Sequence, residues 1–327
     1  MIQNRGQFNA YFYKYRRQAL CAPPDNPLGN LDSIMAVPQR IHDIRKYIEE
    51  VSALPPLPEA ARQLLALKDD PHASARAVGT VIEHDPLIAG QLIRHASSPL
   101  FGLRSKVHSI QDAITVLGNK RVMDVAMALI SVRGFQLPKQ GPLNMQWFWR
   151  HAIYTATLMQ LLAEAIPPHP HQPAPATAYA TGLLHNIGVL VIGQVFPTEF
   201  ANINADYAIR PTLALTKIED TRLGANHAQI GMWLLRKWML PAEFIVTAHE
   251  HHNPRYKGEF RAYANLAFVT SCLLAKMDIG DAGAVDPPAN VYFDLKLTPA
   301  SAQQAQQRLS EERASLENLA AEMCQGI

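Results

Sequence analysis

The segment ATGLLHNIGVLVIG, residues 180–193, sets two adjacent polar residues, His185 and Asn186, inside an otherwise apolar run. Burying such a pair costs free energy unless hydrogen bonds or a ligand satisfy it. A histidine followed by an aspartate would be half of a metal site, and here asparagine takes the second place. The question for the whole chain is therefore whether this segment belongs to a hydrolase centre or to the remains of one.

The sequence on both sides of this segment has the periodicity of helices. In SIQDAITVLG, for example, apolar residues recur every three or four positions, at Ile110, Ala113, Ile114 and Leu117. Short segments of this kind are separated by proline, glycine and asparagine, and alternating β-branched runs that would indicate strands are nearly absent. The pattern predicts an all-α fold of two packed helical subdomains.

Composition shifts divide the chain into four parts. Turn residues in CAPPDNPLGN indicate an irregular N-terminal arm over residues 1–38. We expect an N-terminal helical subdomain over 39–140, with about five helices, and a second helical subdomain over 141–280, beyond the break QLPKQGPLN. Residues 281–327 are predicted to form a linker and one C-terminal amphipathic helix.

The C-terminal helix carries an apolar stripe that repeats every seven residues, at Leu309, Leu316 and Met323. A repeat of seven can form a coiled-coil seam, but three heptads with several glutamines make a weak one. We expect this helix to dock onto its own domain, with a homodimer through the helix as the alternative.

Charge and cysteine usage exclude several classes of protein. The 327 residues carry a net charge of only +2, so nucleic acid is not an expected partner. The N-terminus lacks the apolar core of a signal peptide, and no unbroken apolar stretch has the length needed to span a bilayer, so no membrane association is expected. Three widely separated cysteines, Cys21, Cys272 and Cys324, indicate no disulfide framework. We therefore expect a cytoplasmic protein.

The thirteen histidines include several in apolar helical surroundings. Those that we weigh as candidates are His151, His185, His227, His249, His251 and His252. Together they indicate a pocket, because histidine is a common metal ligand and acid–base group. Two others, His169 and His171, fall in the proline-rich loop PPHPHQPAPA and are expected to be solvated.

A second His-Asp pair, His84 and Asp85 in IEHDPLI, could be mistaken for a metal motif. Because Pro86 follows, we predict that Asp85 caps the next helix instead, with the proline in its first turn.

The order of the motifs resembles the HDOD family, the signalling branch of the HD-domain superfamily. The resemblance rests on WFWRH, GLLHNIG, LGANHAQIGMWLLRKWMLP and HEHHNP, and on LPPLPEAARQLLALKDDP and VIEHDPLIAGQLIRHASSPLFG in the first half. It covers roughly residues 50–280. It implies that the second subdomain is an HD-like helical bundle and that the protein acts in bacterial signal transduction.

Catalytic HD phosphohydrolases hold a metal with a histidine, an adjacent His-Asp pair and a later aspartate. By resemblance, His151 matches the first histidine and His185 the histidine of the pair, while Asn186 stands where its aspartate would be. The last aspartate would fall at Cys272. The remaining histidines, His227, His251 and His252, match extra histidines of the HD-GYP branch, whose glycine-tyrosine-proline signature is missing here.

On this alignment both carboxylates of the metal site are replaced. Asparagine offers a neutral carbonyl, and cysteine binds zinc well only as a thiolate. We therefore expect a vestigial pocket with no catalytic residue and no cofactor, in which Asn186 is hydrogen-bonded within the core. If a metal binds at all, the expected ligands are His151, His185 and Cys272, holding zinc.

The function expected from these arguments is that of a non-catalytic HDOD regulatory module that contacts other signalling proteins. The alternative is a phosphohydrolase that uses a divalent zinc, manganese or iron ion and acts on a nucleotide or cyclic dinucleotide. Its candidate residues would be His151, His185, His227, His251 and His252. A third hypothesis is a pocket that binds a nucleotide without cleaving it.

Overall fold

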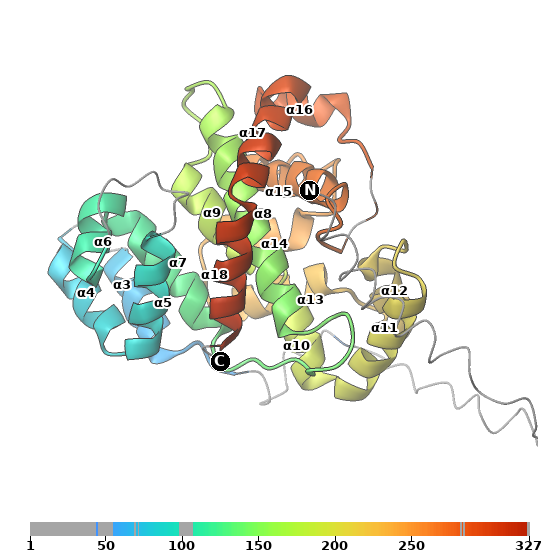
Figure 1. Cartoon of the computed structure of the whole chain (residues 1–327), viewed down its shortest axis with the longest axis horizontal. Coiled ribbons are helices and arrows are strands. Elements are labelled where there is room, and N and C mark those ends of the chain that lie inside the picture. Colours follow the sequence, from blue (N-terminus) through green and yellow to red (C-terminus); the bar gives the residue numbers. More distant parts are fainter. Residues whose placement is uncertain are drawn as a thin grey trace, which may run out of the picture. The chain divides into compact units, whose positions relative to one another are not determined.

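The computed structural model describes residue 44 and residues 55–68, 70, 72–97, 107–281, 283 and 285–325. Within these ranges every regular element is a helix, which confirms the all-α prediction (Figure 1). Residues 41–327 belong to one compact unit. The arm predicted over 1–38 lies outside the described residues.

The first group of helices precedes residue 133. Its described members are α3 (Glu59–Lys68), α4 (Ala75–Glu83), α5 (Pro86–Ala96), α6 (Ile110–Leu117) and α7 (Asn119–Val132). Each of α3 to α6 packs against α7, which is buried along almost its whole length.

The second His-Asp pair is structural, as predicted. The Asp85 carboxylate accepts hydrogen bonds from the backbone N–H groups of Leu87 and Ile88, at 3.1 and 3.3 Å, and Pro86 occupies the first turn of α5. These bonds satisfy amides that a helix start otherwise leaves without partners. This pair is therefore a helix cap and not a metal motif.

The second group surrounds α8 (Met145–Ala165). Its other members are α9 (Pro175–Leu184), α10 (Ile187–Val195), α11 (Pro197–Ile209), α12 (Leu215–Leu223), α13 (His227–Lys237), α14 (Ala242–Glu250) and α15 (Arg261–Ala275). Helix α8 packs against α9 and α15, and α10 packs against α13.

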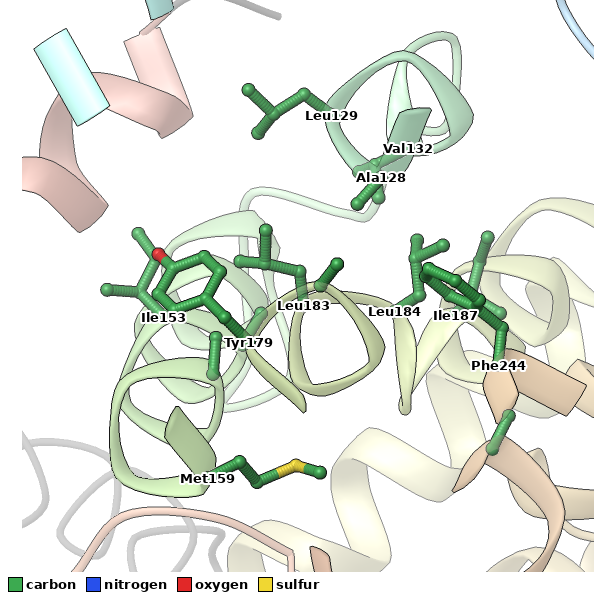
Figure 2. Close-up of a cluster of buried hydrophobic side chains, with 14 of the residues drawn as sticks. Ala128, Leu129, Val132, Ile153, Met159, Tyr179, Leu183, Leu184, Ile187 and Phe244 are labelled. Atoms are coloured by element: carbon green, nitrogen blue, oxygen red, sulfur yellow. The ribbon is translucent and has the colours of Figure 1, made fainter. Parts of the chain in front are cut away.

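Helix α9 joins the two groups, because it packs against both α7 and α8. Figure 2 shows Leu183 of α9 between Ala128 of α7 and the α8 region that carries Ile153. These side chains belong to one continuous set of buried apolar residues. Our division into subdomains at residues 140 and 141 stays a prediction, since the core runs across it.

The C-terminal part contains more helices than predicted. It forms α16 (Ala289–Leu295), α17 (Pro299–Glu311) and α18 (Arg313–Gln325), so the prediction of a single amphipathic helix is wrong. The chain leaves the helical path at Glu312, between α17 and α18, where the backbone takes φ −88° and ψ 8°. This break lets both helices pack on α8 (Figure 1).

The heptad stripe faces the interior of the same chain. Leu309, Leu316 and Met323 are buried, and α18 lies along α8. Glu317 of α18 accepts hydrogen bonds from Arg150 Nε at 2.9 Å and from the Tyr154 hydroxyl at 3.0 Å. The tail is thus docked on its own domain, and a homodimer through it remains an untested prediction.

Helices α9 and α10 together form the most apolar stretch. By length and composition alone, Pro175–Val195 could cross a membrane, contrary to our expectation that no segment is long enough, but 94% of its apolar window is buried inside the protein. A core helix passes the same test of length and composition. The stretch is also divided at His185 and Asn186, between α9 and α10.

Two glycines let the central helices approach closely. A Cβ at Gly182 of α9 would lie 2.6 Å from Ala156 Cα of α8. A Cβ at Gly188 of α10 would lie 2.0 Å from the His227 carbonyl oxygen and 2.7 Å from Gly231 N of α13. Because the obstacles are backbone atoms, they cannot move aside without shifting a helix.

We predict that Gly188→Ala destabilises the fold by about 3 kcal/mol, at the upper end of the cost of overpacking a core. The control is Gly90→Ala in α5, where the nearest atom to a new Cβ is the mobile end of Arg94, at 3.4 Å. That change should be neutral or stabilise by up to about 1 kcal/mol, because alanine favours helix. Urea denaturation measures both, and equal effects would contradict the close-packing argument.

A buried histidine between the two groups links stability to pH. Burial lowers the pKa of His95 in α5 to about 3, with Arg121 contributing, and its Nδ1 lies 3.2 Å from the Tyr179 hydroxyl of α9. Below pH 6.5 the unfolded chain takes up a proton that folded His95 does not, so the free energy of unfolding falls as pH falls from about 6.5 towards 3.

Glutamine does not titrate, so His95→Gln should make the free energy of unfolding less dependent on pH. The expected change is about 1.4 kcal/mol for each unit by which the pKa of His95 differs between the folded and unfolded chain. The exposed His72 provides the control, since His72→Gln should leave the curve unchanged. Denaturation at a series of pH values makes the comparison. A slope unaltered by His95→Gln would show that His95 does not carry the proton linkage.

Candidate functional site

The adjacent residues His185 and Asn186 lie at a break between two helices. His185 ends α9 and Asn186 begins α10, with Asn186 at φ −102° and ψ 20°, outside regular helical geometry. The continuous helical pattern of residues 176–196 is thus divided into two helices. Because the break falls at the pair, both side chains point into the centre of the second group, where each is almost fully buried.

Four further histidines meet the pair from three other helices. His151 comes from α8, His227 is the first residue of α13, and His251 ends α14, with His252 directly after it. Their rings are in contact: centroids lie 4.8 Å apart for His151 and His185, 5.0 Å for His185 and His251, and 4.0 Å for His251 and His252. The structure thus brings together six of the seven predicted site residues.

The seventh, Cys272, does not join them. Its thiol lies on α15, and the charged and titratable groups that act on it are Lys276, Asp286 and Tyr292, towards α16. Burial raises the pKa of the Cys272 thiol to about 11, which disfavours the thiolate that zinc requires. Among the described residues, the metal-suited ligand atoms that lie close together belong to His227, His251, His252 and Asp281, and not to the predicted set of His151, His185 and Cys272.

The centre instead contains a carboxylate that the sequence argument missed, Asp281. Its Oδ2 accepts a hydrogen bond from Asn186 Nδ2 at 2.7 Å and lies 3.3 Å from His227 Nε2 and 3.6 Å from His252 Nε2. Its Oδ1 lies 3.8 Å from His151 Nε2. The centre therefore contains one carboxylate, which Asp281 brings from the loop after α15, although Asn186 and Cys272 stand at the two aligned acid positions. We refer to Asp281, Asn186 and the five histidines as the His–Asp centre.

Helices α11 and α12 hold the loop that carries Asp281. The Leu215 N–H donates to the Asp281 carbonyl at 3.0 Å, and the Tyr207 hydroxyl donates to the Gly280 carbonyl at 3.2 Å. Gly280 has φ +117°, and a Cβ there would lie 3.0 Å from the His151 ring. Only glycine suits both the backbone conformation and the space.

Three of the histidines are oriented by fixed acceptors. The Nδ1 atoms of His185, His227 and His251 lie 2.7 Å from Gly182 O, 2.6 Å from Glu219 Oε2 and 2.9 Å from Ala248 O. Each Nδ1 therefore carries a proton and donates it. In a neutral ring this leaves the lone pair on Nε2, which faces the centre in all three cases. Metal-binding histidines are commonly oriented in this way.

The charges of the centre favour a cation. Burial alone would lower the pKa of His227, but Glu219 and Asp281 raise it above its ordinary value. Burial would raise the pKa of Asp281, but His252, His151 and His227 hold it well below its usual range. His227 thus lies between two acidic side chains, Glu219 and Asp281, inside a buried site.

Burial disfavours the protonated form of three other histidines of the centre. Burial lowers the pKa of His151 to about 4 and lowers those of His185 and His251 well below the ordinary value, because further protonated rings would repel one another. Neutral imidazole is the form that binds a metal.

The residues present fit a divalent transition metal. Ligand atoms of His227, His251, His252 and Asp281 all lie within 4.8 Å of one another. Three buried atoms at the centre lack a hydrogen-bond partner: His151 Nδ1, Asn186 Oδ1 and Asp281 Oδ1. A set of three imidazoles and one carboxylate suits zinc, iron or manganese better than magnesium or calcium.

The His–Asp centre has little contact with solvent. His185, His227 and His251 are fully buried, whereas the His252 side chain is 22% exposed and forms the outer edge. His249, which we had also weighed, lies outside the centre and pairs with Glu250 at 2.7 Å.

Known proteins can now be compared with this geometry. The model of the HDOD domain matches residues 54–254. An uncharacterised protein of Treponema pallidum (strain Nichols) is 25% identical over 228 residues, which cover 67% of this chain and 42% of that protein. The chain therefore spans less than half the length of that relative.

Solved structures share the fold. A candidate signal transduction protein from Marinobacter aquaeolei VT8 superposes with a TM-score of 0.73 and 28% identity, over 96% of this chain and 66% of its own. A candidate phosphohydrolase from Shewanella amazonensis SB2B has a TM-score of 0.65 and 22% identity, over 85% of this chain and 97% of its own. An HDOD domain protein from Geobacter sulfurreducens has a TM-score of 0.64 and 20% identity, over 86% of this chain and 96% of its own. The profile match covers more than half of the chain, and with it the helices that build the His–Asp centre: the chain belongs to the HDOD domain family.

Proposed function

We propose that this protein is a non-catalytic HDOD signalling module whose His–Asp centre holds a divalent metal ion as a structural element. The ion would stabilise the helical surface that the module presents to signalling proteins. The observation that carries the proposal is the near-complete burial of a charged, metal-suited ligand set. The likeness to a candidate signal transduction protein, at 28% identity, supports the signalling role.

Burial argues against hydrolysis at the centre. A catalytic metal needs an open position for water and a path for the substrate. Here the ligand atoms face one another within 4.8 Å, and His252 alone among the four ligands is partly exposed. Burial of three of the four ligands therefore restricts the access of a phosphodiester to an ion at this centre.

Asn186 also argues against hydrolysis. Its amide donates to Asp281 Oδ2 at 2.7 Å and so occupies a carboxylate oxygen that a second metal ion would require. An amide cannot act as a base, and it supplies no charge to a second ion. Replacement of the usual aspartate is therefore consistent with a centre that binds a cation without activating water.

The residues that would hold the ion are His227, His251, His252 and Asp281. When bound, a divalent ion supplies positive charge that balances Asp281. These four ligands come from α13, the end of α14 and the loop after α15, so an ion bound by them would link these three segments. Glu219 orients His227, and the carbonyl of Ala248 orients His251.

Metal-dependent phosphohydrolase activity is the second candidate. The four-ligand set and the partial exposure of His252 favour it, because a ligand at the edge could give way to water. The two candidates differ in whether the metal-loaded protein turns over a phosphodiester.

We predict that protein purified without chelator carries about one equivalent of zinc, iron or manganese, and that Asp281→Asn lowers its affinity by more than about 100-fold. Glu219→Gln leaves the ligands intact but weakens the orientation of His227, so it should lower the metal affinity about 10- to 100-fold. Elemental analysis and competition with a chromogenic chelator measure both effects.

The control variant is His249→Gln, a histidine outside the centre, which should retain the ion. The same preparations are assayed with a generic phosphodiester and added metal. Turnover that His185→Ala abolishes would contradict the non-catalytic proposal and support the hydrolase. Metal-free protein whose melting temperature does not respond to metal or chelator would contradict the metal site itself.

Asn186→Asp should make folding depend on metal. Without an ion, a second carboxylate would replace the amide that donates to Asp281 and would leave an unpaired buried charge. We therefore expect the free energy of unfolding in chelator to fall by about 3 kcal/mol. Added manganese or zinc should restore the stability. Asn202→Asp is the control, since it makes the same change at an exposed position of α11.

Thermal and urea denaturation with chelator and with metal compare the two variants. If Asn186→Asp were as stable in chelator as the parent protein, the hydrogen bond from the Asn186 amide to the Asp281 carboxylate would be contradicted.

A further inference from the structure

A cavity of about 630 Å³ lies outside the His–Asp centre and shares no lining residue with it. It is bounded by the loop between α8 and α9, by the start of α15 and by the end of α16. Its lining includes His169, Gln172, Tyr263 and Asn265. Cavities that bind small organic ligands typically measure about 300–1,000 Å³. His169 and His171, which we expected to be simply solvated, lie at this cavity.

The walls of the cavity are braced. Gln172 Nε2 donates to the carbonyls of Ala163 and Ile166, at 3.2 and 3.1 Å, which ties the loop back to the end of α8. The Ala174 N–H donates to the Tyr263 hydroxyl at 3.1 Å, which ties the same loop to α15. The cavity is therefore a built feature and not a gap beside a loose loop.

Asn265 lines this cavity and carries an amide oxygen without a hydrogen-bond partner. The residue is only 1% exposed. Leaving a buried amide oxygen without a partner costs about 1–3 kcal/mol.

We propose that the cavity binds a nucleobase, carried by a nucleoside or nucleotide, with Asn265 paired to the edge of the base. A side-chain amide offers one acceptor and one donor side by side, which is complementary to the adjacent donor and acceptor on a base edge. Phe260 and Tyr263 supply aromatic surface beside it. Aromatic side chains stabilise bases by stacking.

The rest of the lining suits the sugar. Glu259 and Asp294 line the cavity, and carboxylates accept hydrogen bonds from ribose hydroxyls. The Asp294 carboxylate also pairs with Lys257. Arg261 adds a cation that could meet a phosphate. Nucleosides and nucleotides share the base and differ in the phosphate. Comparing the affinities of the two therefore shows whether Arg261 contributes to binding.

The backbone at the edge is held in an unusual conformation. Phe260 has φ +56°, in the left-handed region that non-glycine residues seldom adopt, and its side chain is 39% exposed beside the cavity. Strain of this kind persists only where the surroundings enforce it. Here the Tyr256 hydroxyl donates to the Glu259 carbonyl at 3.0 Å, directly before Phe260.

The test titrates the full-length protein with the four ribonucleosides and their 5′-monophosphates, by calorimetry and by melting temperature, in chelator. We expect at least one base to bind, and Asn265→Leu to weaken that binding about 10-fold or more. Because Asn265→Leu removes an unpaired buried amide at similar volume, its melting temperature should not fall. That separates lost binding from lost folding.

Thr270→Val is the matched control. Thr270 lies on the same helix, is fully buried, also has a side-chain oxygen without a partner and does not line the cavity. This variant should bind as the parent protein does. Measurement in Asp281→Asn protein keeps the inference separate from the proposed metal site, since binding at the cavity should survive that change.

Three results would overturn the inference. One is the absence of binding of all eight compounds at millimolar concentration. Another is binding that Asn265→Leu leaves unchanged. The third is binding that disappears in Asp281→Asn but persists in Asn265→Leu, which would put the ligand at the His–Asp centre.

Discussion

An ionised carboxylate in the interior of a helical bundle is the constraint around which this protein is arranged. Burying a charge without compensation would cost more than most proteins have in total stability. Asp281 is compensated by the Asn186 amide at 2.7 Å and by histidines from α8, α13 and the end of α14. Each of these partners must arrive from a different helix, so the packing of the helices and the state of the carboxylate depend on one another.

The close helix crossings meet that requirement. Gly182 and Gly188 flank the His185–Asn186 break on either side, and each lies against the backbone of a neighbouring helix. A larger residue at either position would push α9 from α8 or α10 from α13, and would move His151 or His227 away from the pair. The apolar run that surrounds the pair thus has two roles: it fills the core, and it fixes the distances within the His–Asp centre.

A second layer of contacts orients the ligands. Helix α12 contributes both Glu219, which accepts the proton of His227 Nδ1, and the Leu215 N–H, which holds the Asp281 backbone. One short helix therefore sets the direction of two ligands that are 54 residues apart in sequence, at positions 227 and 281.

Much of the architecture follows from the sequence alone. Apolar residues every three or four positions, with proline and glycine between segments, determine an all-α chain, and Asp85 and Pro86 identify a helix start from local chemistry. The resemblance to the HDOD family grouped His151, His185, His227, His251 and His252 in one site. These features depend on neighbours within a few residues or on a recurring order of motifs, so they can be recognised without coordinates.

Only the tertiary structure decided which acid completes the site. Asp281 lies in the loop sequence MDIGDAG, beyond the helix where the family pattern directed attention to Cys272, and nothing local distinguishes it from Asp278 three residues earlier. Its role comes from hydrogen bonds to α11 and α12, which turn the loop inward. The break within the tail at Glu312 and the cavity beside Asn265 are likewise products of packing between distant segments. Contacts of this kind have no periodicity, and for that reason a single sequence does not reveal them.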